Sequence, residues 1–308
     1  MEKIAKLLQD HRQHQAIIKT QKITFLGVDQ EDVYNISRPL VWKGKTYLAG
    51  RVEPRDQEIS RVVFFEAIDD ATYRATPYQL PFLQDPYIAV IDGQLMIGGT
   101  EIFADATRQI THWHTSFYQG SGLDSFKKVL SAPRQMKDVR LFQDYRGIHI
   151  FTRPQGEKAG LGKIGYTFAP KLSDITTELI EQAPIIPGQF GDLTWGGVND
   201  VLLLKNGWIG ILGHIAMMSE TQVRHYYGMT FAFNPKTQVA TPLKIICERR
   251  DFAPGASKRP DLVDVVFAGG IIRHANHLAT LYVGLSDAEG HYALMKDPFL
   301  EYERLMPV

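Results

Sequence analysis

The sequence predicts an all-β protein, a five-bladed β-propeller in a single domain with a short N-terminal helix. Three observations predict this fold class. Helical spacing of apolar residues is almost absent after residue 20, and short runs rich in Val, Ile, Tyr and Phe recur between Gly, Asn and Asp. A hairpin pattern also repeats at intervals of about fifty residues, which indicates a repeat architecture. A β-sandwich or a two-domain β protein is the competing interpretation.

The predicted elements follow one another in a regular order. Residues 1–20 are expected to form a helical extension, since "MEKIAKLLQDHRQHQ" is a short amphipathic run, and residues 21–308 the propeller. The early strand 22–28 is expected to supply the missing edge of the fifth unit and to close the ring. The five hairpins span residues 37–51, 84–99, 137–153, 198–214 and 263–284. Third strands are expected at 61–67, 112–120, 162–169, 225–233 and 290–295, and weaker outer strands at 72–78, 126–132, 176–182 and 240–248. A closed ring of this kind leaves few open sheet edges.

The composition excludes several classes of function. The chain of 308 residues has 34 basic and 34 acidic residues, so it lacks the positive field that nucleic acid binding requires. Cys247 is the only cysteine, which excludes an internal disulfide and a cysteine-based zinc site. With no signal-like start and no apolar run of spanning length, we expect a cytoplasmic protein without a membrane partner. The N-terminal helix is expected to lie against its own propeller; packing on a neighbouring copy, in a homo-oligomer, is the alternative.

The hairpins predict a polar mouth at one end of the ring. Within an antiparallel hairpin, the residue that enters the first strand and the residue that leaves the second lie at the same end. Since the first strand of each blade lines the central channel, five such pairs converge on one opening. The pairs are Arg38 with Arg51, Asp85 with Thr100 and Glu101, Asp138 with Arg153, Asn199 and Asp200 with His214, and Asp264 with Asp287. A concave site that gathers these groups is the default candidate for binding or catalysis.

Each polar residue also has a purely structural interpretation. Asp before a strand is a common turn former. Arg153 could pair only with Asp138 across its own hairpin, and His214 could be a hydrogen-bonded core histidine. The functional hypothesis therefore depends on the coincidence of five polar entries. His112 and His114 share one face of a strand but have no third ligand nearby, so we predict no metal site.

Four short motifs, in order and with compatible spacing over roughly residues 33–300, resemble a known family. They are "LQDPYI", "KDVRLF…FTRP", "GWIGILGH" and "VVFAGG…LYVGLSD". The sequence resembles the mannoside phosphorylases of glycoside hydrolase family 130. It is more similar to the related five-bladed β-1,2-mannan phosphorylases and mannosyltransferases of glycosyltransferase family 108, much of which was long described as a domain of unknown function.

The resemblance implies a role for each matching residue. Asp85 is expected to be the general acid, delivering its proton by way of a hydroxyl group of the mannose. Arg153 and His214 match phosphate-binding positions, with Arg51 and Lys137 near enough to assist. The resemblance implies substrate contacts at Asn35, Ser37, Phe267 and Asp287. Further substrate contacts are expected at the same mouth from Arg38, Asp138, Asn199, Asp264 and Tyr282. One position departs from the family, because "DLTWGGVND" has no Lys where a phosphate-binding Lys usually precedes the His by about twenty residues.

The sequence thus predicts an inverting phosphorylase or mannosyltransferase for β-linked manno-oligosaccharides, with 1,2-linkages favoured. It is expected to use inorganic phosphate as co-substrate, to give mannose 1-phosphate and to need no other cofactor. Phosphate is already a nucleophilic anion, so cations that hold it can replace the base that an inverting hydrolase needs. Two alternatives remain open. One is a glycoside hydrolase on the same scaffold, with Asp138 and Asp264 as additional carboxylates, and the other is a non-catalytic sugar-binding propeller.

Overall fold

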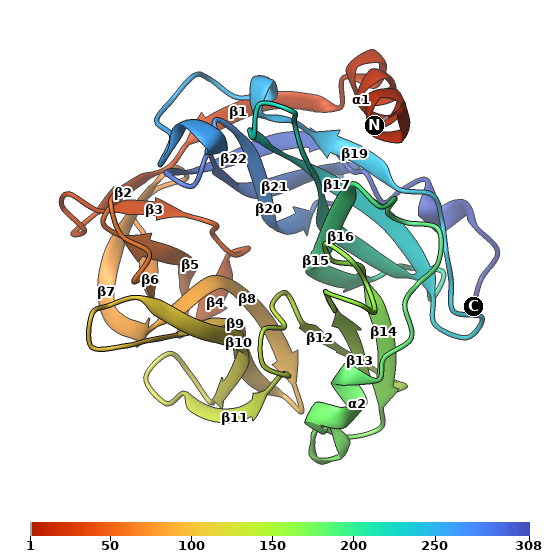
Figure 1. Cartoon of the computed structure of the whole chain (residues 1–308), viewed down its shortest axis with the longest axis horizontal. Helices are drawn as coiled ribbons and strands as arrows, with labels where there is room; N and C mark the ends of the chain where they lie inside the picture. Colours follow the sequence, from red (N-terminus) through yellow and green to blue (C-terminus); the bar gives the residue numbers. More distant parts are fainter. Residues whose placement is uncertain (1) are drawn as a thin grey trace.

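The computed structural model describes residues 2–308 and shows β-sheets arranged in a ring around a central axis (Figure 1). These residues form 22 strands and only two α-helices, which confirms the predicted all-β class. Four short 3₁₀ helices occur in connections, at Leu172–Asp174, Arg249–Asp251, Pro260–Leu262 and Tyr302–Arg304.

The first half of the ring contains three separate sheets. The six-stranded sheet has the order β2–β7–β6–β5–β3, with β4 also on β5; its strands are β2 (Thr24–Leu26), β3 (Asp32–Tyr34), β4 (Leu40–Trp42), β5 (Lys45–Glu53), β6 (Arg61–Ala67) and β7 (Thr72–Pro81). The four-stranded sheet comprises β8 (Leu83–Ile91), β9 (Gln94–Ala104), β10 (Ile110–Gly120) and β11 (Lys127–Ser131). The three-stranded sheet comprises β12 (Arg140–Asp144), β13 (Gly147–Thr152) and β14 (Gly165–Ala169).

The second half is one nine-stranded sheet made of two antiparallel groups. The first group comprises β15 (Thr194–Leu203), β16 (Ile209–Met218), β17 (Arg224–Asn234), β18 (Val239–Ala240) and β19 (Lys244–Cys247). The second comprises β20 (Asp264–Arg273), β21 (Leu278–Leu285), β22 (Glu289–Lys296) and β1 (Ile17–Lys22). The strand pairing that joins the two groups is the parallel contact of β17 with β20, at His225↔Asp264 and Tyr226↔Val265.

The ring closes through the N-terminal segment, but not with the predicted residues. Strand β1 pairs antiparallel with β22, so Ile17–Lys22 supplies the last edge, whereas 22–28 was expected there. Strand β2 instead pairs parallel with β7 in the first sheet. Ile23 is buried between β1 and β2 and anchors the chain where it passes from one sheet to the next. The helical extension expected over residues 1–20 accordingly ends early, at His14.

The predicted outer strand at 176–182 is wrong. This segment forms the short helix α2 (Thr177–Glu181) instead. The Thr176 hydroxyl accepts a hydrogen bond from the Leu179 backbone N–H at 3.1 Å, which caps the helix, and Ile180 within the helix is fully buried. Local capping chemistry therefore overrides the repeat pattern in the third sheet.

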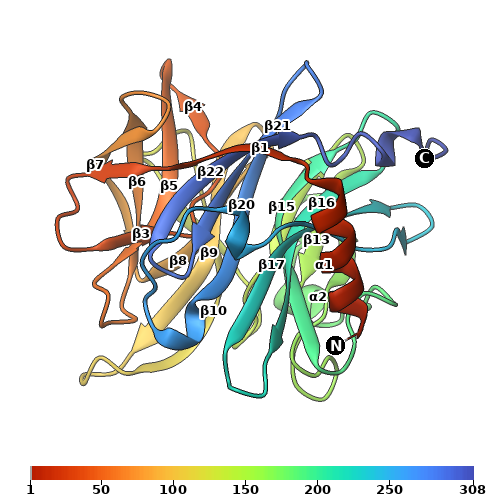
Figure 2. The ribbon, with the colours of Figure 1, turned by 90° about the horizontal axis from the view of Figure 1, so that it is seen from above.

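Helix α1 (Glu2–His14) lies on the outside of the ring next to β19 (Figures 1 and 2). Its apolar residues Ile4 and Leu8 are buried against the sheets. Arg12 makes a bidentate pair with Glu248, with both N–O distances 2.8 Å. These contacts hold the helix on its own ring. Neither α-helix among residues 2–308 is long and apolar enough to cross a membrane.

Candidate active site

The inner strands are interrupted at equivalent places near the central axis. Strand β8 shifts register between Gln84 and Tyr87, which leaves Asp85 and Pro86 unpaired in a bulge. Strand β15 has an extra residue at Asn199, and β20 has one at Gly269. Such bulges redirect side chains and are frequent beside active sites. They turn polar residues toward the axis.

Two further polar residues lie just outside the ends of strands next to the cavity. Asn35 follows β3, and Asp138 precedes β12. Both have left-handed backbone angles, with φ of +45° and +59°, as does Asp85 with +51°. Asn and Asp tolerate this region better than other residues with a Cβ atom, and local strain of this type clusters at functional sites.

Two glycines allow the close packing that the site needs. A Cβ atom on Gly269 would lie 1.9 Å from the Ile36 carbonyl oxygen, so only glycine fits where these inner strands approach. A Cβ atom on Gly197 would lie 3.0–3.2 Å from atoms of Arg153, His214 and Asp138. Gly197 therefore leaves room for the polar groups of the third sheet and of β16.

These residues surround a cavity of about 130 Å³. Nine residues predicted for the site line it: Asn35, Arg51, Asp85, Lys137, Asp138, Arg153, His214, Phe267 and Asp287. Arg224, Tyr226, Leu262 and Val265 complete the lining. We call Asn35, Arg51, Asp85 and Asp287 the acid side of the cavity, and Lys137, Asp138, Arg153 and His214 the cation side.

On the acid side, Asp85 accepts two hydrogen bonds at one oxygen. Asn35 donates to Asp85 Oδ1 at 2.8 Å, and Arg51 Nη1 lies 3.4 Å from the same oxygen. Asp85 is only 8% exposed. The two donors fix the orientation of the carboxyl group and leave Oδ2 without a protein donor among the described residues.

A network of charges supports Asp85 from behind. Arg51 donates from Nε and Nη2 to Glu53 Oε2, at 3.1 and 2.9 Å. Glu53 also accepts hydrogen bonds from the Tyr34 hydroxyl group and from the Lys258 ammonium group. Arg51, which was expected to assist phosphate binding, is thus held on the acid side by Glu53 and Asp85.

Asp287 differs from Asp85 in its surroundings. Burial raises the pKa of Asp287 to about 6, and the nearby Asp85 and Glu53 charges add to the increase, whereas Arg51 and Lys258 oppose it. Asp287 therefore keeps its proton to a higher pH than a free aspartic acid does.

On the cation side, Arg153 is only 2% exposed, and part of its guanidinium group is already hydrogen-bonded to the protein. Its Nε donates to the Gly196 carbonyl oxygen at 2.9 Å, and Nη1 lies 3.3 Å from Asp138 Oδ2 without forming a hydrogen bond. Burial would raise the pKa of Asp138, but the charges of Arg153 and Lys137 lower it to about 2. Asp138 is therefore ionised and fixes the guanidinium, which has an N–H group free for an anion.

His214 is held in one tautomer by Asn199. The Asn199 amide donates to the Ala268 carbonyl oxygen at 2.9 Å, so its Oδ1 accepts from His214 Nδ1 at 3.0 Å. Burial lowers the pKa of His214 to about 3, and the Arg153 charge contributes to the decrease. The imidazole is thus neutral, with its lone pair on Nε2. It can accept a hydrogen bond from a hydrogen phosphate or from a hydroxyl group.

Sequence reasoning missed Arg224 and Tyr226 as cavity residues. Tyr226 stacks on the His214 ring with centroids 5.4 Å apart, and its hydroxyl oxygen accepts a hydrogen bond from Trp195 Nε1 at 3.0 Å. Arg224 lies two residues before it, with Nη1 3.4 Å from Asp261 Oδ2. The alternation in "RHYYG" shows that both share one strand face, but only the parallel pairing of β17 with β20 brings that face to the axis.

Five predicted site residues do not line the cavity. Asn199 lies behind His214, and Ser37 accepts a hydrogen bond from the Ala49 backbone N–H at 3.2 Å. Arg38 donates to the Ile88 carbonyl oxygen at 3.0 Å.

Asp264 was expected at the mouth because it begins the fifth hairpin, but the bulge of that strand lies five residues later. Asp264 is bound by His225 Nδ1 at 2.6 Å, and Tyr282 packs near Tyr292, with centroids 6.2 Å apart.

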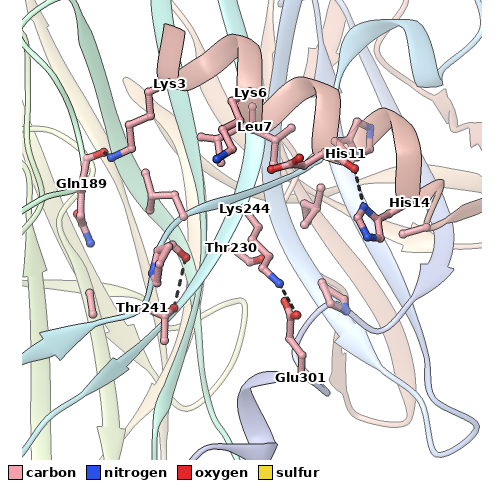
Figure 3. A pocket seen from close by; sticks show the side chains of 18 of the residues that line it. Lys3, Lys6, Leu7, His11, His14, Gln189, Thr230, Thr241, Lys244 and Glu301 are labelled. Carbon is pink, nitrogen blue, oxygen red and sulfur yellow. Dashed lines mark hydrogen bonds and ion pairs between the residues drawn. The ribbon is translucent and has the colours of Figure 1, made fainter.

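A larger groove of about 870 Å³ lies between α1 and the outer strands (Figure 3). Two of its lysines are engaged with the protein itself. Lys3 donates to the carbonyl oxygens of Gly188 and Gln189, and Lys244 pairs with Glu301. Lys6 and Asp10 also line the groove, but both are exposed on α1, unlike the buried Asp85 and Arg153 of the small cavity.

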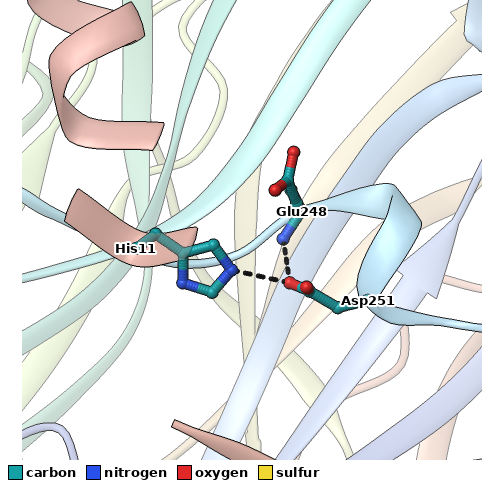
Figure 4. A group of neighbouring side chains, drawn as sticks. All are labelled: His11, Glu248 and Asp251. Atoms are coloured by element: carbon teal, nitrogen blue, oxygen red, sulfur yellow. Dashed lines mark hydrogen bonds and ion pairs between the residues drawn. The ribbon is translucent and has the colours of Figure 1, made fainter. Parts of the chain in front are cut away.

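His11, Glu248 and Asp251 are the one group of possible metal ligands found among residues 2–308 (Figure 4). His11 Nε2 lies 2.8 Å from Asp251 Oδ2. Both oxygens of Glu248 are bound by Arg12, and one also by Arg250 at 2.6 Å. Because the guanidinium groups of Arg12 and Arg250 already bind both oxygens of Glu248, this carboxylate is poorly placed to coordinate a metal ion. The cluster instead holds α1 against the ring.

The whole chain is similar to solved structures of two characterised proteins. Mannose phosphorylase MPT-4 from Leishmania mexicana, solved with phosphate ion, superimposes with a TM-score of 0.91 and 30% identity, over 100% of this chain and 96% of that one. The GDP-Man-dependent mannosyltransferase MPT-1 from the same organism gives 0.88 and 27%, over 99% and 98% of the two chains.

More distant structures share the fold alone. β-1,2-Mannobiose phosphorylase from Listeria innocua has a TM-score of 0.65 and 14% identity, over 89% of this chain and 93% of that one. None of the curated proteins compared with the chain matched it. The family model described as protein of unknown function DUF1861 matches residues 9–301. The chain therefore belongs to the DUF1861 family, and the predicted resemblance to mannose phosphorylases and mannosyltransferases is confirmed.

Proposed function

We propose that this protein is an inverting phosphorylase or mannosyltransferase for β-linked manno-oligosaccharides, with 1,2-linkages favoured, which uses inorganic phosphate and gives mannose 1-phosphate. As a member of a group that includes a mannose phosphorylase and a mannosyltransferase, the chain is an enzyme that acts on glycans. One observation carries the proposal: a single small cavity holds the Asp85 carboxyl group together with a buried Arg153 guanidinium that has an N–H group without a partner.

The proposed reaction uses the two sides of the cavity differently. Phosphate lies on the cation side, where Arg153 and Lys137 balance its charge and His214 Nε2 accepts a hydrogen bond from its remaining O–H group. A phosphate oxygen attacks the anomeric carbon as the bond to the glycosidic oxygen breaks. Asp85 supplies the proton that this leaving oxygen requires, so that the charge moves from phosphate to Asp85. The attack inverts the anomeric configuration.

The residues around Asp138 make hydrolysis the weaker hypothesis. An inverting hydrolase needs a basic carboxylate to activate water. The low pKa of Asp138 makes it a poor base, and Asp264, the other candidate, is outside the cavity.

We also propose that the ring is one domain of five blades. The first three sheets would be one blade each, and the parallel β17–β20 contact would divide the nine-stranded sheet into the fourth and fifth. Distant glycoside hydrolase neighbours support a propeller-type fold.

The test is an incubation of the purified protein with β-1,2-mannobiose, with and without inorganic phosphate. We expect mannose 1-phosphate and free mannose only when phosphate is present. A parallel incubation of mannose 1-phosphate with mannose acceptors should release phosphate. Free mannose at the same rate without phosphate would establish the hydrolase, and no turnover with any mannoside or donor would favour a binding protein.

A further inference from the structure

The acid side of the cavity contains one carboxyl group more than its cations balance. Arg51 and Lys258 are the buried cations. They contact the buried carboxylates Glu53 and Asp85, and both also lie within 3.5 Å of Glu58. Glu58, which is half exposed, has its own partner in Arg259 at 2.6 Å. Two cations therefore face two anions.

Asp287 is the remaining carboxyl group. It lines the same cavity, and among residues 2–308 no hydrogen-bond donor reaches its side chain. The nitrogens of Arg51 are directed to Glu53, Glu58 and Asp85, and Lys258 donates to Glu53 and to the Gln57 carbonyl oxygen. Asp287 is partly exposed in the cavity. An ionised Asp287 would be a third anion without a partner, and its repulsion from the charges of Asp85 and Glu53 favours the protonated form.

We propose that Asp287 is the proton-carrying carboxyl group of this cavity, and that it must be protonated for the sugar to bind tightly. As a neutral acid it donates its O–H to a hydroxyl oxygen of the sugar, while Asp85, held by Asn35 and Arg51, remains the anion of the pair before the sugar binds. The identity of the sugar rests on the proposed function, whereas the location of the proton does not.

The same proton can supply the reaction. When the sugar bridges the two carboxyl groups, the O–H bond of Asp287 breaks and an O–H bond forms on Asp85. The negative charge moves from Asp85 to Asp287, and the number of protons in the pair is unchanged. Asp85 is then the acid that the leaving oxygen needs.

The groups that face Asp287 set its pH range. Arg51 and Glu53 come from β5, Tyr34 from β3, Asp85 from β8 and Lys258 from the connection before β20. Their combined effect with burial is the raised pKa of about 6, so the proton is present in mildly acidic solution and is lost at alkaline pH. For a sugar that binds only the protonated form, the dissociation constant should rise about 50-fold between pH 6 and pH 8, because half of the protein is already deprotonated at pH 6.

Infrared spectroscopy of the free protein tests where the proton is. At pH 5 we expect a carboxylic-acid C=O band that titrates near pH 6, is absent in Asp287→Asn and persists in the exposed-site control Asp124→Asn. Asp85→Asn should keep the band but shift its titration to lower pH, because one negative charge is gone. A band that disappears in Asp85→Asn and remains in Asp287→Asn would overturn the proposal, whether or not the protein is a phosphorylase.

Calorimetric binding of mannobiose without phosphate gives the second readout. The wild type should bind more weakly as the pH rises above 6. Asp287→Asn, whose amide can still donate, should bind with little dependence on pH between 5 and 8. A wild-type dissociation constant that does not change over this range would contradict the proposal. The wild-type titrations alone decide this point if a variant fails to fold.

Discussion

Replacement of Arg153 by lysine separates the charge of this residue from its geometry. The guanidinium uses Nε for the Gly196 carbonyl oxygen and lies beside Asp138 through Nη1. Lysine keeps one positive charge, which can still balance Asp138, and so avoids the loss of about 3–5 kcal/mol expected when a buried carboxylate is left unpaired. A single ammonium nitrogen cannot, however, also present the forked donors that match phosphate.

The expected magnitude follows from that lost contact. A hydrogen bond to a charged group contributes about 1.5–3 kcal/mol, which corresponds to a decrease of about 10- to 150-fold in kcat/KM for phosphate. Initial rates at varied phosphate concentration measure it, and the affinity for mannobiose alone should change little. Arg55→Lys is the control, because Arg55 is half exposed, pairs with Asp32 and lies outside the cavity. A folded Arg153→Lys enzyme with unchanged kcat/KM for phosphate would refute the assignment of the cation side.

Three further predictions follow from the same contacts. Asp85→Asn should lower kcat by about 10²–10⁴-fold while mannobiose still binds in calorimetry; near-normal turnover would remove Asp85 as the acid. Asn199→Leu removes the acceptor that fixes the His214 tautomer and should lower kcat/KM for phosphate by up to about tenfold, with rates unchanged if His214 only fills space. Because the pKa of Asp287 is raised in the folded state, stability should fall as the pH rises from about 4 to about 6. Asp287→Asn lacks this loss and should be more stable than the wild type at pH 8 in urea unfolding, by at most about 3 kcal/mol; equal stability at pH 8 would contradict the raised pKa.

Much of the fold could be predicted because the information is local and repeated. Alternating apolar residues and Gly- or Asp-containing turns mark nearly every strand, and each hairpin forms between neighbours in the chain. The errors lie where a local signal competes with the repeat. Thr176 caps a helix in place of an outer strand, and the closing strand is weakly patterned, with Lys19 and Gln21 within Ile17–Lys22.

The site could be predicted only as far as the inner strands determine it. Asp85 and Asp138 lie at strand entries that the sequence marks, and both line the cavity. The bulge in β20 lies at Gly269, which has no polar side chain, so the sequence predicted Asp264 at the start of the strand as the site residue instead. Lys258 and Glu53 are 205 positions apart in the sequence, and no local sequence pattern predicts their contact.

A crystal structure of the protein with inorganic phosphate tests the central claim most directly. The account predicts a tetrahedral anion in the cavity within hydrogen-bonding distance of Arg153 Nη1 and His214 Nε2, with space for a sugar ring between it and Asp85. An anion bound at Arg51 on the acid side, or an empty cavity at saturating phosphate, would contradict it.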